Sequence, residues 1–158
     1  MPIEPAIDCH VHVFDPARFP YGADAWYRPL PSEAGTAVQL AHLLDTHHVR
    51  HALIVGPNSG YGLDNRCLLD ALAQGRGRYK GVAVVPNDAS ASELQDLQAQ
   101  GVVGVAFKVA AMGSDRTSLR QVVGHCQIFR AITVLHRCAA LCESLDRSVH
   151  AAIAGVGF

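Results

Sequence analysis

The residues best suited to chemistry stand near the start of the chain, in the stretch IDCHVH at positions 7–12. Alternate side chains of a β-strand point to the same side, so Asp8, His10 and His12 would share one face. Neutral imidazole is the commonest protein ligand for divalent transition metals, and two imidazoles on one strand face could grip one ion. A pair of hydrogen-bonded structural histidines is the alternative interpretation.

Two loops could complete a site around these histidines. The segment FDPARFPYGADAWYRPLPSEAG, positions 14–35, holds four prolines, two glycines, two arginines and three tyrosine or tryptophan residues. Loops this long without regular structure are uncommon unless they are functional. A second, glycine-rich turn, PNSGYG at positions 57–62, follows an apolar run.

The elements that must position these loops alternate regularly along the chain. Apolar runs predict four strands, and helical spacing with capping signals predicts three helices between them. Strand–helix alternation implies parallel strands with right-handed crossovers. Four such units make half of an eight-unit barrel, which typically needs around 250 residues, or most of an open doubly wound sheet. The expected strands are 6–11, 51–56, 79–85 and 102–110, and the expected helices are 36–48, 63–75 (capped by Asp64) and 90–100 (capped by Ser90 with Glu93).

Active sites of parallel α/β folds gather at the carboxyl ends of the strands. His10 and His12 fall at the end of the first expected strand, which favours a functional role for the pair.

Composition excludes several classes of function. The 158 residues are 49% hydrophobic and 17% charged with a net charge of −1, so neither disorder nor a nucleic-acid partner is indicated. No run approaches the roughly 18 apolar residues of a membrane span. The five cysteines form no CxxC pair, which argues against a disulfide framework. We expect a soluble cytoplasmic protein.

The last part of the chain differs in composition from the rest. All eight prolines lie at or before Pro86, and the balance of charge changes from acidic before position 116 to basic after it. Residues 118–145 fit one or two helices, with an irregular tail as the alternative, and no fifth strand is evident. We therefore divide the chain into a region of β/α units, 1–112, which the resemblance described next implies is half of a barrel, and an atypical tail, 113–158, which suits a frameshifted or truncated sequence.

Several stretches resemble one known family: IDCHVHVFDP, FPYGADAWYRP, SGYGLDNRCLLDAL, GVAVV and ELQDLQAQGVVGVAF. They are similar to the amidohydrolase-related (amidohydrolase 2) family of the metal-dependent hydrolase superfamily, whose members are distorted (β/α)8 barrels. Within it, the stretches are most similar to lactone hydrolases acting on 2-pyrone-4,6-dicarboxylate and related compounds. The resemblance covers roughly residues 6–113.

The resemblance implies roles for individual residues. His10 and His12 match a first-strand pair that is catalytic, and that ligates zinc or manganese in many members but works without metal in lactonase-like ones. The resemblance also implies substrate contacts for four residues. They are Tyr27 in the first loop, Ser59 and Tyr61 in the second loop, and Lys108 on the fourth expected strand. Tyr27 could instead cap the barrel mouth, and Lys108 could imitate a carboxylated, metal-bridging lysine.

The departures from the family pattern are as informative. Relatives commonly carry two arginines on the fourth strand, where this chain has Val103 and Ala106. The family's later histidines and its aspartate base are not recognisable, because His125, His136 and His150 lie in different surroundings. A folded-back His125 could complete the site.

The resemblance therefore predicts a hydrolase that opens a lactone or similar cyclic carboxylic ester by attack of water on the carbonyl. C–N hydrolysis and decarboxylation are variants within the same family. The alternative is a non-catalytic half-barrel that self-associates through its open sheet edge. Because a third ligand and a base are missing from the recognised motifs, we expect the chain alone to have little or no hydrolase activity.

Overall fold

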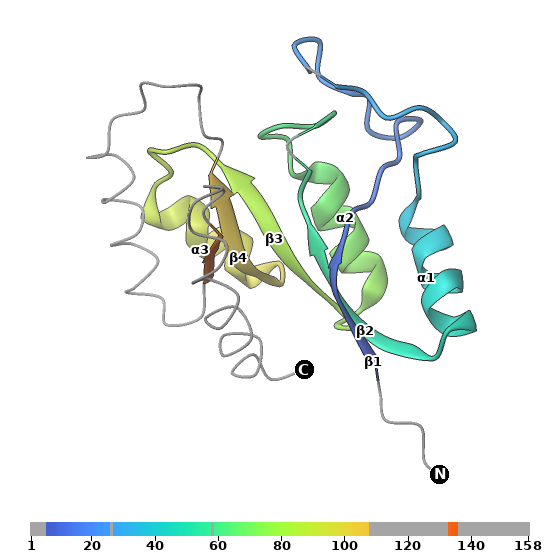
Figure 1. Cartoon of the computed structure of the whole chain (residues 1–158). Helices are drawn as coiled ribbons and strands as arrows, with labels where there is room; N and C mark the ends of the chain where they lie inside the picture. The colour runs from blue at the N-terminus through green and yellow to red at the C-terminus, as the bar shows by residue number, and fades with distance from the viewer. Residues whose placement is uncertain (1–5, 26, 58, 108–132, 136–158) are drawn as a thin grey trace, which may run out of the picture.

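The computed structural model of the chain describes residues 6–25, 27–57, 59–107 and 133–135. These residues form one parallel sheet with strand order β1-β2-β3-β4-β5, and helices alternate with the first four strands (Figure 1). The strands are β1 (Ala6–Val11), β2 (Val49–Val55), β3 (Tyr79–Val85), β4 (Val102–Phe107) and β5 (Thr133–Leu135), and the helices are α1 (Ala37–Thr46), α2 (Arg66–Gly75) and α3 (Ala91–Ala99). The predicted parallel order of the first four strands is confirmed.

Two helices begin with capping boxes, and the cap predicted at Ser90 is confirmed. Thr36 opens α1 and Ser90 opens α3, each through a capping box with the glutamine or glutamate three residues later. These reciprocal bonds satisfy backbone N–H groups that a helix start would otherwise leave unpaired.

The predicted start of α2 is wrong by one residue. Asn65, not Asp64, occupies the cap position, and its side chain makes no capping hydrogen bond. Asp64 instead accepts a hydrogen bond from the backbone N–H of Arg66 at 3.1 Å and forms an ion pair with the Arg66 guanidinium. The side chain of Asn65 is engaged elsewhere, on β3.

The core lies between the helices and the central strands. Leu40 and Leu44 of α1 are buried, and α2 contributes Leu68 and Leu72 at helical spacing. The side chains of β3 are almost all buried, whereas those of β1 are mostly exposed because β1 stands at the edge of the described sheet. The site at the end of β1 is therefore built on the most accessible strand.

The fifth strand corrects the expectation of helix over residues 118–145. Thr133, Val134 and Leu135 pair in parallel with Gly104, Val105 and Ala106 of β4. Two of these three residues are β-branched, and they satisfy backbone groups along an edge of β4 that would otherwise lack a partner. The rest of that predicted helix and nearly all of the tail at 113–158 lie outside the described residues.

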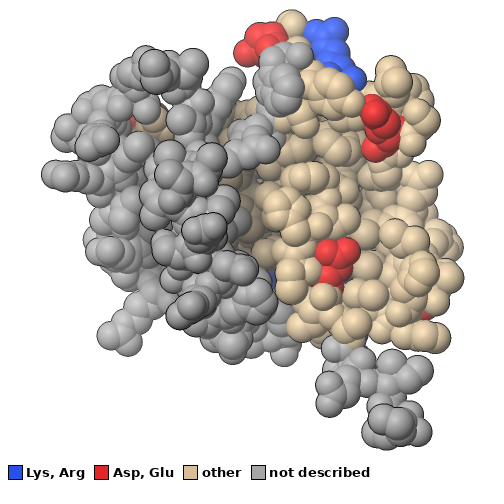
Figure 2. All heavy atoms as spheres, in the orientation of Figure 1, with Lys and Arg blue, Asp and Glu red and all other residues tan. Residues whose placement is uncertain are grey.

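Among the described residues, no helix is long and apolar enough to cross a membrane. The face shown in Figure 2 carries only scattered acidic and basic side chains on its described part.

Candidate active site at the carboxyl ends of the strands

The rings of His10 and His12 lie together at the end of β1. Their centroids are 5.0 Å apart and the planes meet edge to face at 89°. This proximity agrees with the alternation predicted from sequence. Asp8 accepts a hydrogen bond from the backbone N–H of His10 at 3.0 Å, so its carboxylate supports the local backbone.

The hydrogen bond of His12 fixes the proton on its ring. Nδ1 lies 2.6 Å from the carbonyl oxygen of Val55, the last residue of β2. Since a carbonyl can only accept, Nδ1 carries the hydrogen and the neutral ring presents a lone pair at Nε2. His12 is thus prepared to accept a proton or to ligate a metal through Nε2.

The described donors do not by themselves fit a metal site. Catalytic zinc usually takes three protein ligands, whereas the end of β1 supplies two imidazoles. No group of three histidine, cysteine, aspartate or glutamate side chains that could hold an ion occurs within the described ranges. Binding of zinc or manganese at His10 and His12 stays a prediction.

Two loops meet at the same end of the sheet, above the ends of β1 and β2 (Figure 1). Gly60 joins them: its N–H donates to the carbonyl of Tyr27 at 2.8 Å, and its carbonyl accepts from Gly22 at 2.9 Å. Gly60 has φ +72, and a Cβ there would lie 2.9 Å from the ring of Tyr21. Only glycine fits this junction without strain.

Contacts between aromatic rings also join the two loops. Phe14 stacks on Tyr61 with centroids 5.9 Å apart, and Tyr21 lies 5.2 Å from Tyr61. The hydroxyl of Tyr61 accepts a hydrogen bond from the backbone N–H of Asp15 at 2.9 Å. Burial raises the pKa of Tyr61, which keeps its hydroxyl protonated. Tyr61, predicted to contact substrate, is 6% exposed and holds the β1 loop in place.

Tyr27 lies on the exposed surface of the first loop. Its hydroxyl donates to the Glu33 carboxylate at 2.6 Å, and the ring is 43% exposed. The same bond raises the pKa of Tyr27 and lowers the pKa of Glu33. A substrate contact through the Tyr27 hydroxyl would have to replace Glu33.

Of the two remaining predicted site residues, Ser59 is described by the structure and Lys108 is not. Ser59 is half-buried beside Gly60, and its carbonyl accepts from the N–H of Tyr61 at 2.8 Å. Val103 and Ala106, which replace the arginines of the family pattern, are half-buried on β4. Lys108, with the three tail histidines, lies outside the described residues, so its substrate contact stays a prediction.

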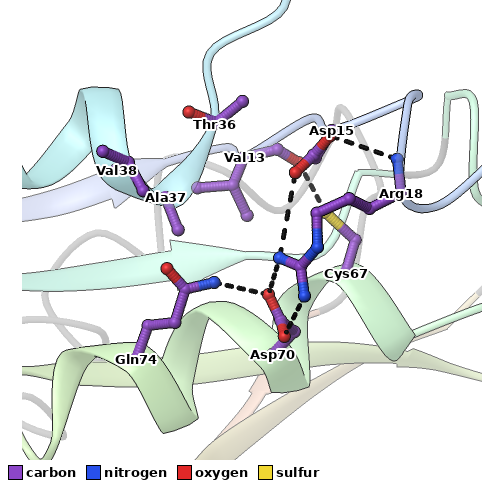
Figure 3. Close-up of a pocket in the computed structure, with 9 residues that line it drawn as sticks. All are labelled: Val13, Asp15, Arg18, Thr36, Ala37, Val38, Cys67, Asp70 and Gln74. Carbon is purple, nitrogen blue, oxygen red and sulfur yellow. Dashed lines mark hydrogen bonds and ion pairs between the residues drawn. The ribbon is translucent and has the colours of Figure 1, made fainter.

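A separate cavity of about 270 Å³ lies between α1, α2 and the loop after β1 (Figure 3). One wall is a two-bond contact in which the guanidinium of Arg18 donates to both Asp70 oxygens at 2.7 and 2.9 Å. Gln74 also donates to Asp70 at 2.6 Å. None of the predicted site residues lines this cavity, so the cavity is distinct from the histidine site.

Sequence patterns missed one residue of the site's framework, Asn65. Its amide bonds to the backbone of Val84, 19 residues away, at 2.8 and 2.9 Å. The only available signal was the pair Asp64-Asn65 at a helix start, which predicted a cap.

Comparison with curated proteins identifies similar hydrolases. The chain is 38% identical over 104 residues to 2-pyrone-4,6-dicarboxylate hydrolase of Comamonas testosteroni, covering 65% of this chain and 32% of that protein. It is 34% identical over 103 residues to 4-sulfomuconolactone hydrolase of Rhizobium radiobacter, covering 65% and 33%. The chain thus spans about a third of the length of these relatives.

Solved structures share the fold. A probable 2-pyrone-4,6-dicarboxylic acid hydrolase of Acinetobacter baumannii, solved with citric acid bound, has a TM-score of 0.68 at 28% identity, over 82% of this chain and 48% of that one. A Pseudomonas putida structure gives 0.68 at 24% identity, over 94% and 54%, which bears on the fold alone. The four parallel β/α units are therefore part of a TIM-barrel-type fold.

A family model described as Amidohydrolase matches residues 7–158. Because this match covers nearly the whole chain, the chain belongs to the amidohydrolase family.

Proposed function

We propose that the carboxyl end of this sheet binds a small carboxylated lactone and takes part in the hydrolysis of its ring ester. The observation that carries the proposal is the bond from His12 Nδ1 to Val55, which leaves Nε2 with a lone pair beside His10. The two curated relatives are hydrolases of a pyrone dicarboxylate and of a sulfomuconolactone, which supports a cyclic ester as the substrate class.

Hydrolysis of a lactone requires a base that activates water and an acid that protonates the departing ring oxygen. The oxygen of water adds to the ring carbonyl carbon while Nε2 of His12 accepts the proton of that water. The tetrahedral intermediate collapses with cleavage of the ring C–O bond, and the imidazolium returns the proton to the departing oxygen. A positioned general base of this kind contributes roughly 10²–10⁴-fold to a rate.

The joined loops would hold the substrate. The hydroxyl of Ser59 offers a neutral donor for a carboxylate, and Lys108 is proposed as a cationic contact. Because the arginines of the family pattern are absent at Val103 and Ala106, we expect binding weaker than a two-bond guanidinium contact would give.

Binding and turnover are measured separately, by calorimetry with 2-pyrone-4,6-dicarboxylate and by loss of its ultraviolet absorbance. We expect the pyrone to bind, and any turnover to vanish in the double variant His10→Ala, His12→Ala. The matched control is His51→Ala, because His51 also contacts a carbonyl, that of Arg78 at 3.3 Å, but precedes the carboxyl end of β2 by four residues.

The outcomes discriminate between the candidate functions. Binding with turnover that requires the histidine pair supports the hydrolase. Binding without turnover, with or without added zinc or manganese, supports the non-catalytic half-barrel. Release of carbon dioxide in place of ring opening would favour the decarboxylase variant, and absence of binding contradicts the proposal.

A further inference from the structure

The side-chain amide of Asn65 makes the two hydrogen bonds with β3 that a neighbouring strand would make. Its Oδ1 accepts from the backbone N–H of Val84 at 2.9 Å, and its Nδ2 donates to the carbonyl of Val84 at 2.8 Å. Asparagine at a helix start normally accepts from the helix's own N–H groups. Here the amide is turned to the sheet, and α2 begins without it.

The reason lies in the way β2 ends. Val55 pairs with Val82 of β3, and Gly56 still donates to the carbonyl of Val82 at 2.7 Å. Val84 lies two residues further, so its N–H and carbonyl point to the same edge of β3. In a parallel ladder the bonding residues of a strand alternate, so pairing of Val84 would need a longer β2, and β2 ends at Val55. The amide of Asn65 supplies the donor and acceptor that β2 does not.

The same amide also bonds to the loop that carries Ser59 and Tyr61, two of the predicted substrate contacts. Nδ2 of Asn65 donates to the carbonyl of Leu63 at 3.2 Å, and the neighbouring Asp64 N–H donates to the carbonyl of Tyr61 at 3.0 Å. Through Gly60, this loop is bonded to Tyr27 and Gly22 of the first loop. A single side chain thus connects β3 to both loops.

We propose that Asn65 is a positioning residue, whose amide replaces the missing strand neighbour of Val84 and fixes residues 59–65 over the carboxyl end of the sheet. The inference deepens the proposed function and rests on it for its effect on lactone binding. Its structural part stands on the hydrogen bonds alone.

Amide hydrogen exchange followed by NMR tests the structural part. In Asn65→Ala the Val84 amide should exchange about tenfold faster or more, since it loses its acceptor, and the amides of Gly22 and Gly60 should accelerate with it. The matched control is Gln74→Ala, which removes another side-chain amide of α2, bonded to Asp70, and should leave these three amides unchanged. Faster exchange at Val84 with unchanged Gly22 and Gly60 would overturn the proposal, because Asn65 would then anchor only its own helix.

The variant Asn65→Asp keeps the test decisive if Asn65→Ala does not fold. Its carboxylate can accept from the Val84 N–H but repels the Val84 carbonyl, whereas the protonated acid can donate to that carbonyl. Protection at Gly60 should therefore be low at neutral pH and recover as the acid protonates. Protection equal to that of the parent chain at neutral pH would contradict the proposed role of the donor.

Calorimetry with 2-pyrone-4,6-dicarboxylate tests the functional part. We expect Asn65→Ala to weaken binding about tenfold or more, with Gln74→Ala equal to the parent chain. Unchanged affinity in Asn65→Ala would overturn the link to binding. If the parent chain itself fails to bind the pyrone, the proposed function is wrong, and the exchange experiment decides the positioning role independently.

Discussion

The Nδ1 atom of His12 lies 2.6 Å from the carbonyl oxygen of Val55, so the imidazole at the end of β1 is held by the last residue of β2. This bond links strands whose residues are 43 positions apart in the chain. It assigns different tasks to the two ring nitrogens of His12. Nδ1 holds the ring to β2, and Nε2 is left for the proposed reaction.

The variant His12→Asn tests the two nitrogens of His12 separately. Its Nδ2 can still donate to Val55, but it has no lone-pair nitrogen corresponding to Nε2. We expect thermal stability close to that of the parent chain and a loss of any lactone turnover by about 100-fold or more. His51→Asn is the control. Turnover retained in His12→Asn would show that Nε2 takes no part in the reaction.

Gly60 and Gly62 provide a test of the joint between the loops. Both have positive φ, +72 and +56, so an alanine at either position costs about 1–2 kcal/mol of backbone strain. A Cβ on Gly60 would also meet the ring of Tyr21, whereas the space around Gly62 is open within 4 Å. We expect urea unfolding to show a larger loss of stability for Gly60→Ala than for Gly62→Ala. Equal losses would mean that the loops do not depend on close contact at Gly60.

Tyr61 and Tyr21 differ in what their hydroxyls do. Tyr61→Phe would leave the partly buried N–H of Asp15 without its acceptor, which should cost about 1 kcal/mol. The hydroxyl of Tyr21 is buried and has no hydrogen-bond partner in the described part of the chain, so Tyr21→Phe should be neutral or slightly stabilising. Denaturant midpoints of the two variants measure the difference. A destabilised Tyr21→Phe would reveal a partner supplied from elsewhere.

The contact between Arg18 and Asp70 should make stability depend on pH. The two hydrogen bonds from Arg18 lower the pKa of Asp70 below its ordinary value of 3.8. A carboxyl whose pKa is depressed by folding stabilises the folded state above 3.8, and this contribution is lost as the pH falls through its folded pKa. Asp70→Asn should therefore lower the melting temperature at neutral pH.

The same comparison repeated in acid tests the sign of this effect. The difference between Asp70→Asn and the parent chain should shrink as the pH falls below 3.8. Asp88→Asn, at an exposed position after β3, controls for the loss of one negative charge. A difference that stays constant with pH would mean that the Arg18 contact does not stabilise the fold.

Local patterns in the sequence determined the first four strands, their parallel order and the cap of α3 at Ser90. Strand alternation also predicted that His10 and His12 lie together. These features depend on residues within a few positions of one another, because side-chain direction and capping bonds are set by the neighbouring backbone.

Only the tertiary structure decided which residue begins α2, what Tyr61 and Tyr27 contact, and where β5 forms. Asp64 and Asn65 are equally good caps by local rules, and the choice depends on Val84, whose backbone groups β2 leaves unpaired. Tyr61 bonds to Asp15 across 46 positions of the chain. Such partners are set by where the chain folds back on itself, since a buried polar group must find its hydrogen bond among whatever the packing brings near it.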